Sequence, residues 1–364
     1  MGTTGLEPGT SSVSWKRSNQ LSYAPVAGRT LAVVIGMTHL PLVDVAPLVD
    51  GHGDVETTGR EIDHACRDIG FFRITGHGVD QALLGRIDAA ARQFFAQPDE
   101  LKQAIAMAKA GSAWRGWFPV GGELTSGRPD RKEGLYVGAE HPPTHPRVVA
   151  GVPLHGPNLF PDEPAELGPA ILEWLTELER VANAVMRGIA IGLGLEATWF
   201  EEHVTDDPTV LFRIFHYPPG DESDWGVAEH TDYGLLTLLA QDDRGGLQVH
   251  GPDGWIDVPA EPDVLVCNIG DMLDRLTEGR YRSTPHRVRN LSGQSRLSFP
   301  FFFDPSWDAE VVPLPLEGSP PADDADRRWD GTSVRLWDGT YGDYLTAKVA
   351  RVFPELFARL DVTR

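Results

Sequence analysis

The feature that most constrains the fold is a change in the hydrophobic period of the chain near residue 209. Upstream, apolar residues mostly recur at the spacing of helices; downstream, they alternate with polar residues, as in strands. Turn-forming Gly, Pro and Asp residues separate the downstream segments. We therefore predict strands at 209–217, 234–240, 246–249, 255–257, 264–268, 286–289 and 295–303. Evenly spaced short strands of this kind indicate a β-sandwich or jelly roll.

The N-terminal half carries helical patterns around two short strands. The apolar spacing predicts one helix over 56–67, another that begins after Asp80 as its N-cap, and a long one over 164–194. The strands are predicted at 40–45 and 70–74. Residues 111–160 hold many Gly, Pro and Trp residues, and we predict a long irregular loop there. The aromatic side chains of this loop favour a functional role for it.

These patterns divide the chain into four parts. Residues 1–37 show almost no amphipathic period and are expected to form a loosely ordered arm. Residues 38–164 are expected to wrap on the core, and residues 165–310 to supply a scaffold helix and the core itself. Residues 311–364 are expected to form an acidic loop and a terminal helix near 340–360 that pack on the core. The expected fold is therefore mainly β with flanking helices.

The charge balance narrows the class of partner. The 364-residue chain has 53 acidic and 32 basic side chains, a net charge of −21, which disfavours binding to nucleic acid or to an anionic membrane. A small-molecule partner is expected instead, and an anion would have to be bound locally by a specific basic residue. Two isolated cysteines, Cys66 and Cys267, suit a reduced cytoplasm. The start of the chain does not resemble a signal peptide, and no apolar run reaches about 18 residues, so we expect a cytoplasmic protein.

A histidine and a carboxylate precede the strand predicted at 234–240. His230 and Asp232 are two residues apart, so in an extended chain both point to one face, about 6.5–7 Å apart. His286 begins a distant strand that a jelly roll can bring beside this pair. Two histidines and one carboxylate on one face of an ion are typical of non-haem Fe(II) oxygenases. Zinc would also accept these ligands, so a metallohydrolase remains open on the ligand types alone.

A second constellation lies on the last predicted strand. Arg296 and Ser298 are two residues apart, so both can point into the same apolar interior. A buried guanidinium requires an anionic partner, and its fork of donors suits a carboxylate. The partner could be the carboxylate of a ligand or one of the acidic residues of the chain. The hydroxyl of Tyr217 could contact the same ligand, or Tyr217 could be a half-buried core residue.

With these residues in view, the chain resembles the iron(II)- and 2-oxoglutarate-dependent dioxygenases of the isopenicillin N synthase-like group. The motifs that carry the resemblance follow the order of that family and span about residues 40–305. They are 68–72 (DIGFF), 76–79 (GHGV), 132–134 (KEG), 217–219 (YPP), 230–237 (HTDYGLLT), 245–249 (GGLQV), 268–271 (NIGD), 283–288 (STPHRV) and 296–298 (RLS). Phe215 departs from the pattern, because many plant members carry Asn two residues before the tyrosine.

The resemblance implies a distorted double-stranded β-helix, that is, a jelly-roll or cupin-like core. It implies that the two histidines and the aspartate bind Fe(II), and that Arg296, Ser298 and Tyr217 bind the distal carboxylate of the cosubstrate 2-oxoglutarate. O2 is then the second cosubstrate. The reaction implied is hydroxylation, desaturation or ring closure of a small molecule, with release of succinate and CO2, as in secondary metabolism.

Two other functions stay open at this point. Isopenicillin N synthase itself and the plant ethylene-forming oxidase keep the Arg-x-Ser motif without using 2-oxoglutarate, so a 2-oxoglutarate-independent iron oxidase is one alternative. A non-catalytic jelly roll that retains a metal for stability is another. The candidates for the substrate pocket are Trp117, Phe118, Tyr136 and Phe303. They indicate a substrate with apolar area, whereas the identity of the substrate and the oligomeric state are not predicted.

Overall fold

Two β-sheets build the body of the protein. The computed structural model describes Met1 and residues 39–353, except 126, 220–224, 329–330, 332 and 334. Apart from Met1, the arm expected over 1–37 lies outside the described residues. From residue 39 onward, the described chain belongs to one compact unit. None of its helices is both long enough and apolar enough to cross a membrane.

In this part of the chain the major sheet has the strand order β1-β2-β12-β9-β14-β7-β6-β3. Its strands are β1 (Leu42–Asp44), β2 (Phe71–Thr75), β3 (Gly116–Phe118), β6 (Glu133–Gly138), β7 (Pro208–Tyr217), β9 (Leu236–Gln241), β12 (Leu265–Ile269) and β14 (Arg296–Ser306). The minor sheet has the order β11-β10-β13-β8. Its strands are β8 (Val227–His230), β10 (Leu247–Gly251), β11 (Gly254–Val258) and β13 (His286–Val288). A short ribbon pairs β4 (Leu124–Thr125) with β5 (Arg128–Pro129).

The long strand β14 shows how the major sheet is buried on both faces. Successive side chains of a strand point to opposite faces. On one face, the side chains of Leu297, Phe299, Phe301 and Phe303 are at most 1% exposed, and β14 packs against the long helix α6 (Leu167–Gly192). On the other face, Arg296, Ser298, Pro300, Phe302 and Asp304 line a cavity. The strand therefore separates an apolar layer from a cavity whose wall has both polar and apolar side chains.

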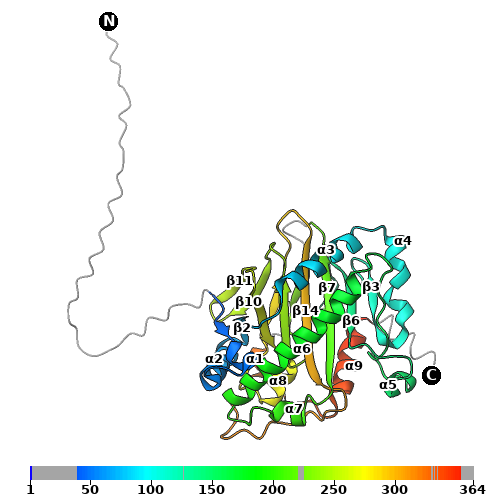
Figure 1. The fold of residues 1–364 in the computed structure, drawn as a ribbon. Coiled ribbons are helices and arrows are strands. Elements are labelled where there is room, and N and C mark those ends of the chain that lie inside the picture. Colours follow the sequence, from blue (N-terminus) through cyan, green and yellow to red (C-terminus); the bar gives the residue numbers. More distant parts are fainter. Residues whose placement is uncertain are drawn as a thin grey trace. The chain divides into compact units, whose positions relative to one another are not determined.

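Helices cover the apolar face of the major sheet. Figure 1 shows α6 crossing this face, where it contacts β7, β9 and β14. Gly188 permits close packing of α6 on α2, because a Cβ at this position would lie 2.6 Å from Cδ1 of Ile62. The other α-helices are α1 (Ala46–Asp50), α2 (Val55–Asp68), α3 (Gln81–Phe95), α4 (Asp99–Lys102), α5 (Pro146–Val149), α7 (Trp199–His203), α8 (Asp271–Leu276) and α9 (Tyr341–Val352). The described chain also contains the 3₁₀ turns η1 (Gln103–Ile105), η2 (Met107–Ala113) and η3 (Ala325–Arg327).

The prediction of an irregular loop over 111–160 is wrong. This segment contains β3 and β6, and β6 pairs with β7 to extend the major sheet. Every residue of both strands is buried, so the segment has no alternation of polar and apolar residues from which a strand could be recognised. With β1 and β2, the N-terminal half supplies half of the strands of the major sheet. It is therefore part of the core and is not only wrapped on it.

The expectation that His230 and Asp232 lie on one face of the same strand is also wrong. The unpredicted strand β8 ends at His230, and Asp232 lies in the turn that leads to β9. The unpredicted helix α8 holds this turn, since the backbone N–H of Asp271 donates to the carbonyl of Asp232 at 2.7 Å. The position of the carboxylate therefore depends on a tertiary contact as well as on local strand geometry.

Candidate metal centre

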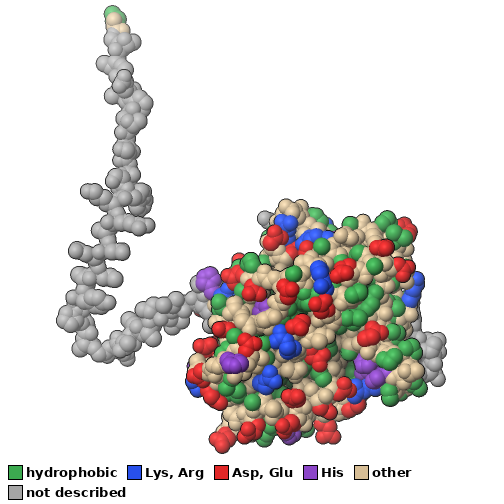
Figure 2. Space-filling model, in the orientation of Figure 1, with side chains coloured by type: hydrophobic (Ala, Val, Ile, Leu, Met, Phe, Trp, Pro, Cys, Tyr) green, Lys and Arg blue, Asp and Glu red, His purple; other side chains and the backbone are tan. Residues whose placement is uncertain are grey.

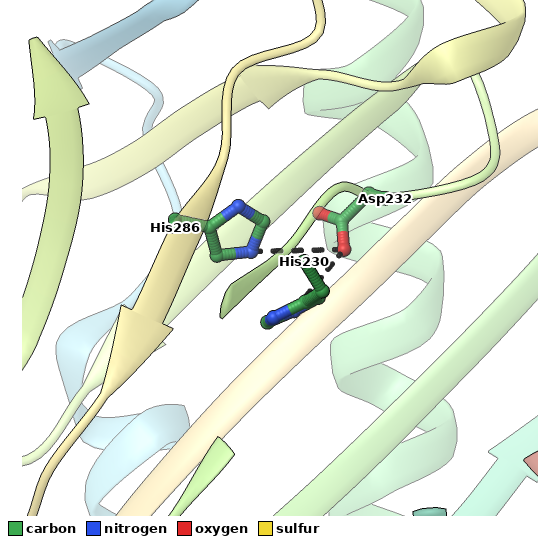
Figure 3. A group of neighbouring side chains, drawn as sticks. All are labelled: His230, Asp232 and His286. Atoms are coloured by element: carbon green, nitrogen blue, oxygen red, sulfur yellow. Dashed lines mark ion pairs between the residues drawn. The ribbon is translucent and has the colours of Figure 1, made fainter. Parts of the chain in front are cut away.

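Three side chains that could hold a metal ion converge inside the protein (Figure 3). His230, at the end of β8, and His286, at the start of β13, are direct partners in the antiparallel ladder, with ring centroids 4.2 Å apart. Oδ1 of Asp232 lies 4.0 Å from Nε2 of His230 and 3.8 Å from Nε2 of His286. The three ligand atoms all lie within 4.8 Å of one another. Among the described residues, this is the only such group of three.

Backbone carbonyls fix the orientation of both imidazole rings. Nδ1 of His230 lies 2.8 Å from the carbonyl oxygen of Ala228, and Nδ1 of His286 lies 3.3 Å from that of Thr284. Because a carbonyl only accepts, each Nδ1 carries the proton in the neutral ring. The lone pair of each Nε2 is then available on the side that faces Asp232, as a metal ligand requires.

The Asp232 carboxylate is oriented by two strands of the major sheet. Its Oδ2 accepts a hydrogen bond from the hydroxyl of Thr237 on β9 at 2.6 Å and another from Nδ2 of Asn268 on β12 at 2.7 Å. These two residues are register partners in the β9–β12 ladder. The two bonds leave Oδ1 for a metal, and partners of this kind typically account for about 10–100-fold in metal affinity.

Burial controls the protonation of the three groups. It lowers the pKa of His286 to about 4, with a further contribution from His230, and it also lowers the pKa of His230. Burial opposes ionisation of Asp232, but the two histidines and the two hydrogen bonds hold the pKa of its carboxyl below the usual value. At neutral pH the set is thus two neutral imidazoles and one carboxylate, which is the protonation state that binds a cation.

A fully buried arginine stands near this group. Arg296 pairs with Tyr217 across β14 and β7. Its Nε donates to the carbonyl of Gly245 and its Nη2 to Oε1 of Gln241 at 3.1 Å, whereas Nη1 is buried without a hydrogen-bond partner. The hydroxyl of Ser298 lies 3.4 Å from that of Tyr217. In the described parts of the chain, no carboxylate lies within ion-pair distance of Arg296. The alternative that Arg296 forms a salt bridge with an acidic residue of the chain therefore finds no support there.

These groups line one cavity of about 510 Å³ between the two sheets. The minor sheet contributes the two histidines, the major sheet contributes Arg296 and Tyr217, and α9 forms one wall through Leu345, Lys348 and Val349. A larger cavity of about 700 Å³ adjoins it, but none of the three candidate metal ligands or Arg296 lines that space. The smaller cavity is therefore the candidate active site.

Three of the four aromatic residues expected in the substrate pocket lie elsewhere. Tyr136 lines the cavity. Phe303 lies on the opposite face of β14, and its neighbour Phe302 lines the cavity instead. Trp117 and Phe118 are buried in β3, where Phe118 packs edge-on against Tyr136 with ring centroids 5.1 Å apart. Trp117, Phe118 and Phe303 are therefore withdrawn as residues of the cavity wall.

Several charged residues of the cavity wall were not predicted from the sequence as site residues. They are Arg115, Glu123, Lys132, Arg213, Lys348, Arg351 and Asp304. The pattern on β7 could have revealed Arg213, because it lies four residues before Tyr217 and so shares the face of that tyrosine. Arg115 and Glu123 belong to the segment that was predicted to be irregular, where no period assigns a face.

The donor set fits an iron site with a dicarboxylate cosubstrate. Two imidazoles and a carboxylate gather on one side of the cavity, which leaves the opposite side of an ion open to further ligands. The unpartnered Nη1 of Arg296 suits an anionic group in the same cavity. Fold and site together define the class of jelly-roll oxygenases that use non-haem iron.

Comparison with known proteins gives the particular family. Residues 40–163 match the N-terminal family of non-haem dioxygenases in morphine synthesis, and residues 208–305 match the 2OG-Fe(II) oxygenase superfamily. The chain is 44% identical over 353 residues to a probable iron/ascorbate oxidoreductase of Dictyostelium discoideum, covering 88% of this chain and 97% of that protein. It is 35% identical over 359 residues to the 1-aminocyclopropane-1-carboxylate oxidase of Dictyostelium mucoroides, with the same coverage.

Among solved structures, a full-length Neurospora crassa protein in complex with alpha-KG and thymine is similar, with a TM-score of 0.71 and 26% identity. That likeness covers 86% of this chain and 96% of the Neurospora crassa chain. The chain belongs to the 2OG-Fe(II) oxygenase superfamily. It is an oxidoreductase that uses Fe(II), 2-oxoglutarate and O2, which confirms the resemblance, the jelly-roll fold and the cofactors expected from the sequence. The non-catalytic alternative is set aside.

Proposed function

We propose that this oxygenase hydroxylates a small organic molecule and converts 2-oxoglutarate into succinate and CO2, with His230, Asp232 and His286 as the iron ligands. The observation that carries the proposal is the unpartnered Nη1 of Arg296 in the same cavity as these three residues. One oxygen atom of O2 enters the substrate C–H bond and the other enters succinate, so the atoms balance. Desaturation or ring closure would require only a different pose of the substrate.

Arg296 holds the distal carboxylate of 2-oxoglutarate in this proposal. Its Nη1 donates to the carboxylate, while its bonds to Gly245 and Gln241 fix the plane of the guanidinium. Tyr217 and Ser298 add hydroxyl donors beside it. Burial raises the pKa of Tyr217, so its hydroxyl keeps the proton that it donates.

Bound Fe(II) supplies the redox chemistry that couples oxidation of 2-oxoglutarate and of the substrate to reduction of O2. The protein contributes orientation and a sheltered cavity. Thr237 and Asn268 hold Asp232 in a single pose, and the carbonyl partners hold the two imidazole rings. The apolar part of the cavity wall, which includes Phe302, Leu345 and Val349, excludes water from the reacting groups.

A small molecule is the substrate class that fits the cavity. A volume of about 510 Å³ lies in the range of sites that enclose a metabolite-sized ligand. On the face shown in Figure 2, acidic side chains are spread over the surface. The structural neighbour from Neurospora crassa, in its complex with alpha-KG and thymine, provides a precedent for a small organic ligand beside the cosubstrate. We also propose a cytoplasmic location, where the buried thiols of Cys66 and Cys267 would stay reduced.

An anaerobic titration tests the assignment of the cosubstrate. Adding 2-oxoglutarate to the Fe(II)-loaded protein should produce the visible absorption band of the metal–keto acid chelate, and admission of O2 should yield succinate in step with substrate loss. Turnover without the band and without succinate would instead support the 2-oxoglutarate-independent oxidase. Absence of both turnover and the band would refute the proposed function.

A further inference from the structure

The cavity contains an arginine whose donors are not satisfied by the described residues. Arg213, on β7, has a side chain 17% exposed and lies between the rings of Tyr136 and Phe302, with its guanidinium carbon 4.2 and 4.7 Å from their centroids. In the described structure no hydrogen bond reaches its guanidinium, and its Nε is buried without a partner. The two aromatic rings stabilise the positive charge by packing on the faces of the planar guanidinium. The N–H donors at the edge of the guanidinium therefore remain available to an acceptor.

One acidic residue, Glu123, comes near Arg213 but interacts with other groups. Its Oε1 is 3.7 Å from Nη1 of Arg213, which is too long for a hydrogen bond, and it accepts a bond from the hydroxyl of Tyr136. Its Oε2 forms an ion pair with Nζ of Lys132 at 2.8 Å. Lys132 also pairs with Asp130, so Glu123 is shared between Lys132 and Arg213. Arg213 thus has an ion-pair contact with Glu123 but no hydrogen-bonded counterion among the described residues.

A second arginine, Arg115, lines the same cavity. It is 2% exposed, its Nη2 donates to the carbonyl of Leu154 at 2.8 Å, and its Nε is buried without a partner. Burial lowers the pKa of Arg115 to about 10; Arg213 adds to the lowering, and Glu140 opposes it. No carboxylate of the described residues lies within ion-pair distance of Arg115. Arg115 is therefore a second cation of the cavity wall that lacks an acidic partner among the described residues, which favours an anionic ligand in the cavity.

This pair of arginines is separate from the arginine assigned to 2-oxoglutarate. Arg213 lies four residues from Tyr217, which is the register partner of Arg296, so the two arginine sites are about 13 Å apart along the strand direction. A short dicarboxylate that reaches from the metal to Arg296 cannot also reach Arg213. The Arg213 site must therefore serve a different ligand.

The charge of the cavity agrees with an anionic ligand. Among the described residues, six basic side chains and three acidic ones line it, although the whole chain has a net charge of −21. The basic residues are Arg115, Lys132, Arg213, Arg296, Lys348 and Arg351, and the acidic ones are Glu123, Asp232 and Asp304. A positive interior in an acidic protein attracts anions locally and specifically.

We propose that Arg213, assisted by Arg115, binds a carboxylate of the primary substrate, which makes the substrate a small carboxylic acid with an apolar body. Tyr136, Phe302 and the apolar side chains of the cavity wall pack against that body. The inference rests on the proposed function, because it assigns a substrate class to the same site. Arg213 is the residue that determines specificity, since it discriminates a carboxylate from its neutral analogues.

Matched acids and amides test this inference in the full-length protein with Mn(II) in place of Fe(II) and with saturating 2-oxoglutarate. Hexanoate, phenylacetate, cyclohexanecarboxylate and L-leucine are each titrated beside the corresponding primary amide by calorimetry. We expect at least one acid to bind and its amide to bind about 10- to 100-fold more weakly, because the amide lacks the charge-assisted bond to Arg213. Arg213→Gln should bring the affinity of the acid down to that of the amide, and Arg213→Lys should restore part of the difference.

Arg60→Gln serves as the control, because Arg60 is an exposed residue of α2 outside the cavity wall; it should keep the wild-type preference for acids. Thermal unfolding of ligand-free Arg213→Gln checks its fold, and Arg115→Gln provides a second variant with the same expected direction. Equal affinity for acids and amides, failure of every acid to bind, or an unchanged preference in Arg213→Gln overturns the inference. The Fe(II)–2-oxoglutarate band is measured separately, so a failure of the proposed function is distinguished from a failure of the carboxylate assignment.

Discussion

At the scale of single residues, Asp232 shows how the candidate centre is prepared before a ligand binds. Its Oδ2 accepts two hydrogen bonds from Thr237 and Asn268, while its Oδ1 faces the two imidazoles. The carboxylate therefore cannot rotate without breaking bonds inside the major sheet. Such restraint reduces the conformational cost of metal binding, because the ligand atoms already occupy neighbouring positions.

Loss of the Asn268 side chain should weaken metal binding. Asn268→Ala frees Oδ2 of Asp232 from one of its two partners, so we expect the affinity for Fe(II) to fall by about 10–100-fold. Anaerobic metal titration measures this change. Asn183→Ala is a suitable control, because Asn183 donates only to the carbonyl of Glu179 within α6. An unchanged affinity in Asn268→Ala would show that this bond does not orient the ligand.

Substitution of Arg296 should impair cosubstrate binding, whereas substitution of His230 should abolish turnover. Arg296→Ala leaves the distal carboxylate of 2-oxoglutarate without its partner, which should cost roughly 3–5 kcal/mol of cosubstrate binding because Arg296 is fully buried. Ser298→Ala should cost about 1 kcal/mol, since it removes one hydroxyl contact. His230→Ala should abolish turnover with the fold intact. Titration of the visible band and a succinate assay measure these effects, and equal small effects from Arg296→Ala and His230→Ala would contradict the assignment.

At the scale of elements, the sequence predicted the strands that carry the cosubstrate site better than the turn that carries the carboxylate. Arg296 and Ser298 share a face because β14 alternates, and the paired strand β7 was also predicted. The position of Asp232 depends on α8, which contacts the turn after β8, and neither element has a distinctive local period. The ligands could thus be named from residue types, whereas their geometry required tertiary contacts.

The residues predicted to line the substrate pocket also show that residue type alone does not determine position in the fold. Trp117, Phe118 and Phe303 are aromatic for reasons of core packing, so composition alone misassigned them to the cavity. The face of a residue can be assigned only where strand boundaries are known, and β3 was not predicted. Arg213 was accessible to such reasoning, because β7 was predicted and Tyr217 had already defined its inner face.

A cluster of three histidines near α5 should make stability depend on acid pH. The rings of His141 and His145 are 4.4 Å apart, and those of His141 and His155 are 5.1 Å apart. Burial, with contributions from His155 and His145, lowers the pKa of His141 to about 4. Because this folded-state pKa lies below the unfolded value, the group contributes stability above about pH 6.5 and loses that contribution as the pH falls towards 4.

Replacement of His141 should therefore reduce the loss of stability in acid. Between pH 7 and pH 4.5, the free energy of unfolding of His141→Gln should change by a smaller destabilising amount than that of the wild type. Urea unfolding at both pH values measures the difference. His52→Gln is the matched control, because His52 lies on the exposed loop after α1, away from this cluster. Identical pH dependence in His141→Gln and the wild type would rule out the cluster as the source.

At the scale of the whole molecule, the two sheets supply different halves of the site. The histidines belong to the minor sheet, and Arg296, Ser298 and Tyr217 belong to the major sheet. Bound metal and cosubstrate would add a link between the sheets to contacts that already exist, such as the edge-on packing of Phe71 against His286. This arrangement makes the two ligands interdependent, because 2-oxoglutarate needs the metal at one end and Arg296 at the other.

Thermal unfolding should report this interdependence. Mn(II) alone should raise the Tm, 2-oxoglutarate alone should have little effect, and the two together should raise the Tm by more than the sum of the separate shifts. A ligand at 100 times its Kd stabilises the native state by about 2.7 kcal/mol, which is large enough to detect in such a scan. EDTA should cancel both shifts in the wild type.

Two variants separate the contributions of the sheets. Arg296→Ala should keep the shift caused by Mn(II) and lose the further shift caused by 2-oxoglutarate, whereas His286→Ala should lose both. The reason is that 2-oxoglutarate without a metal loses the chelate at one end and keeps only its contacts with Arg296, Tyr217 and Ser298 at the other. A 2-oxoglutarate shift that persists at full size in EDTA, or in Arg296→Ala, would mean that the cosubstrate binds elsewhere. That result would contradict the hypothesis that metal and 2-oxoglutarate together link the two sheets through the cavity.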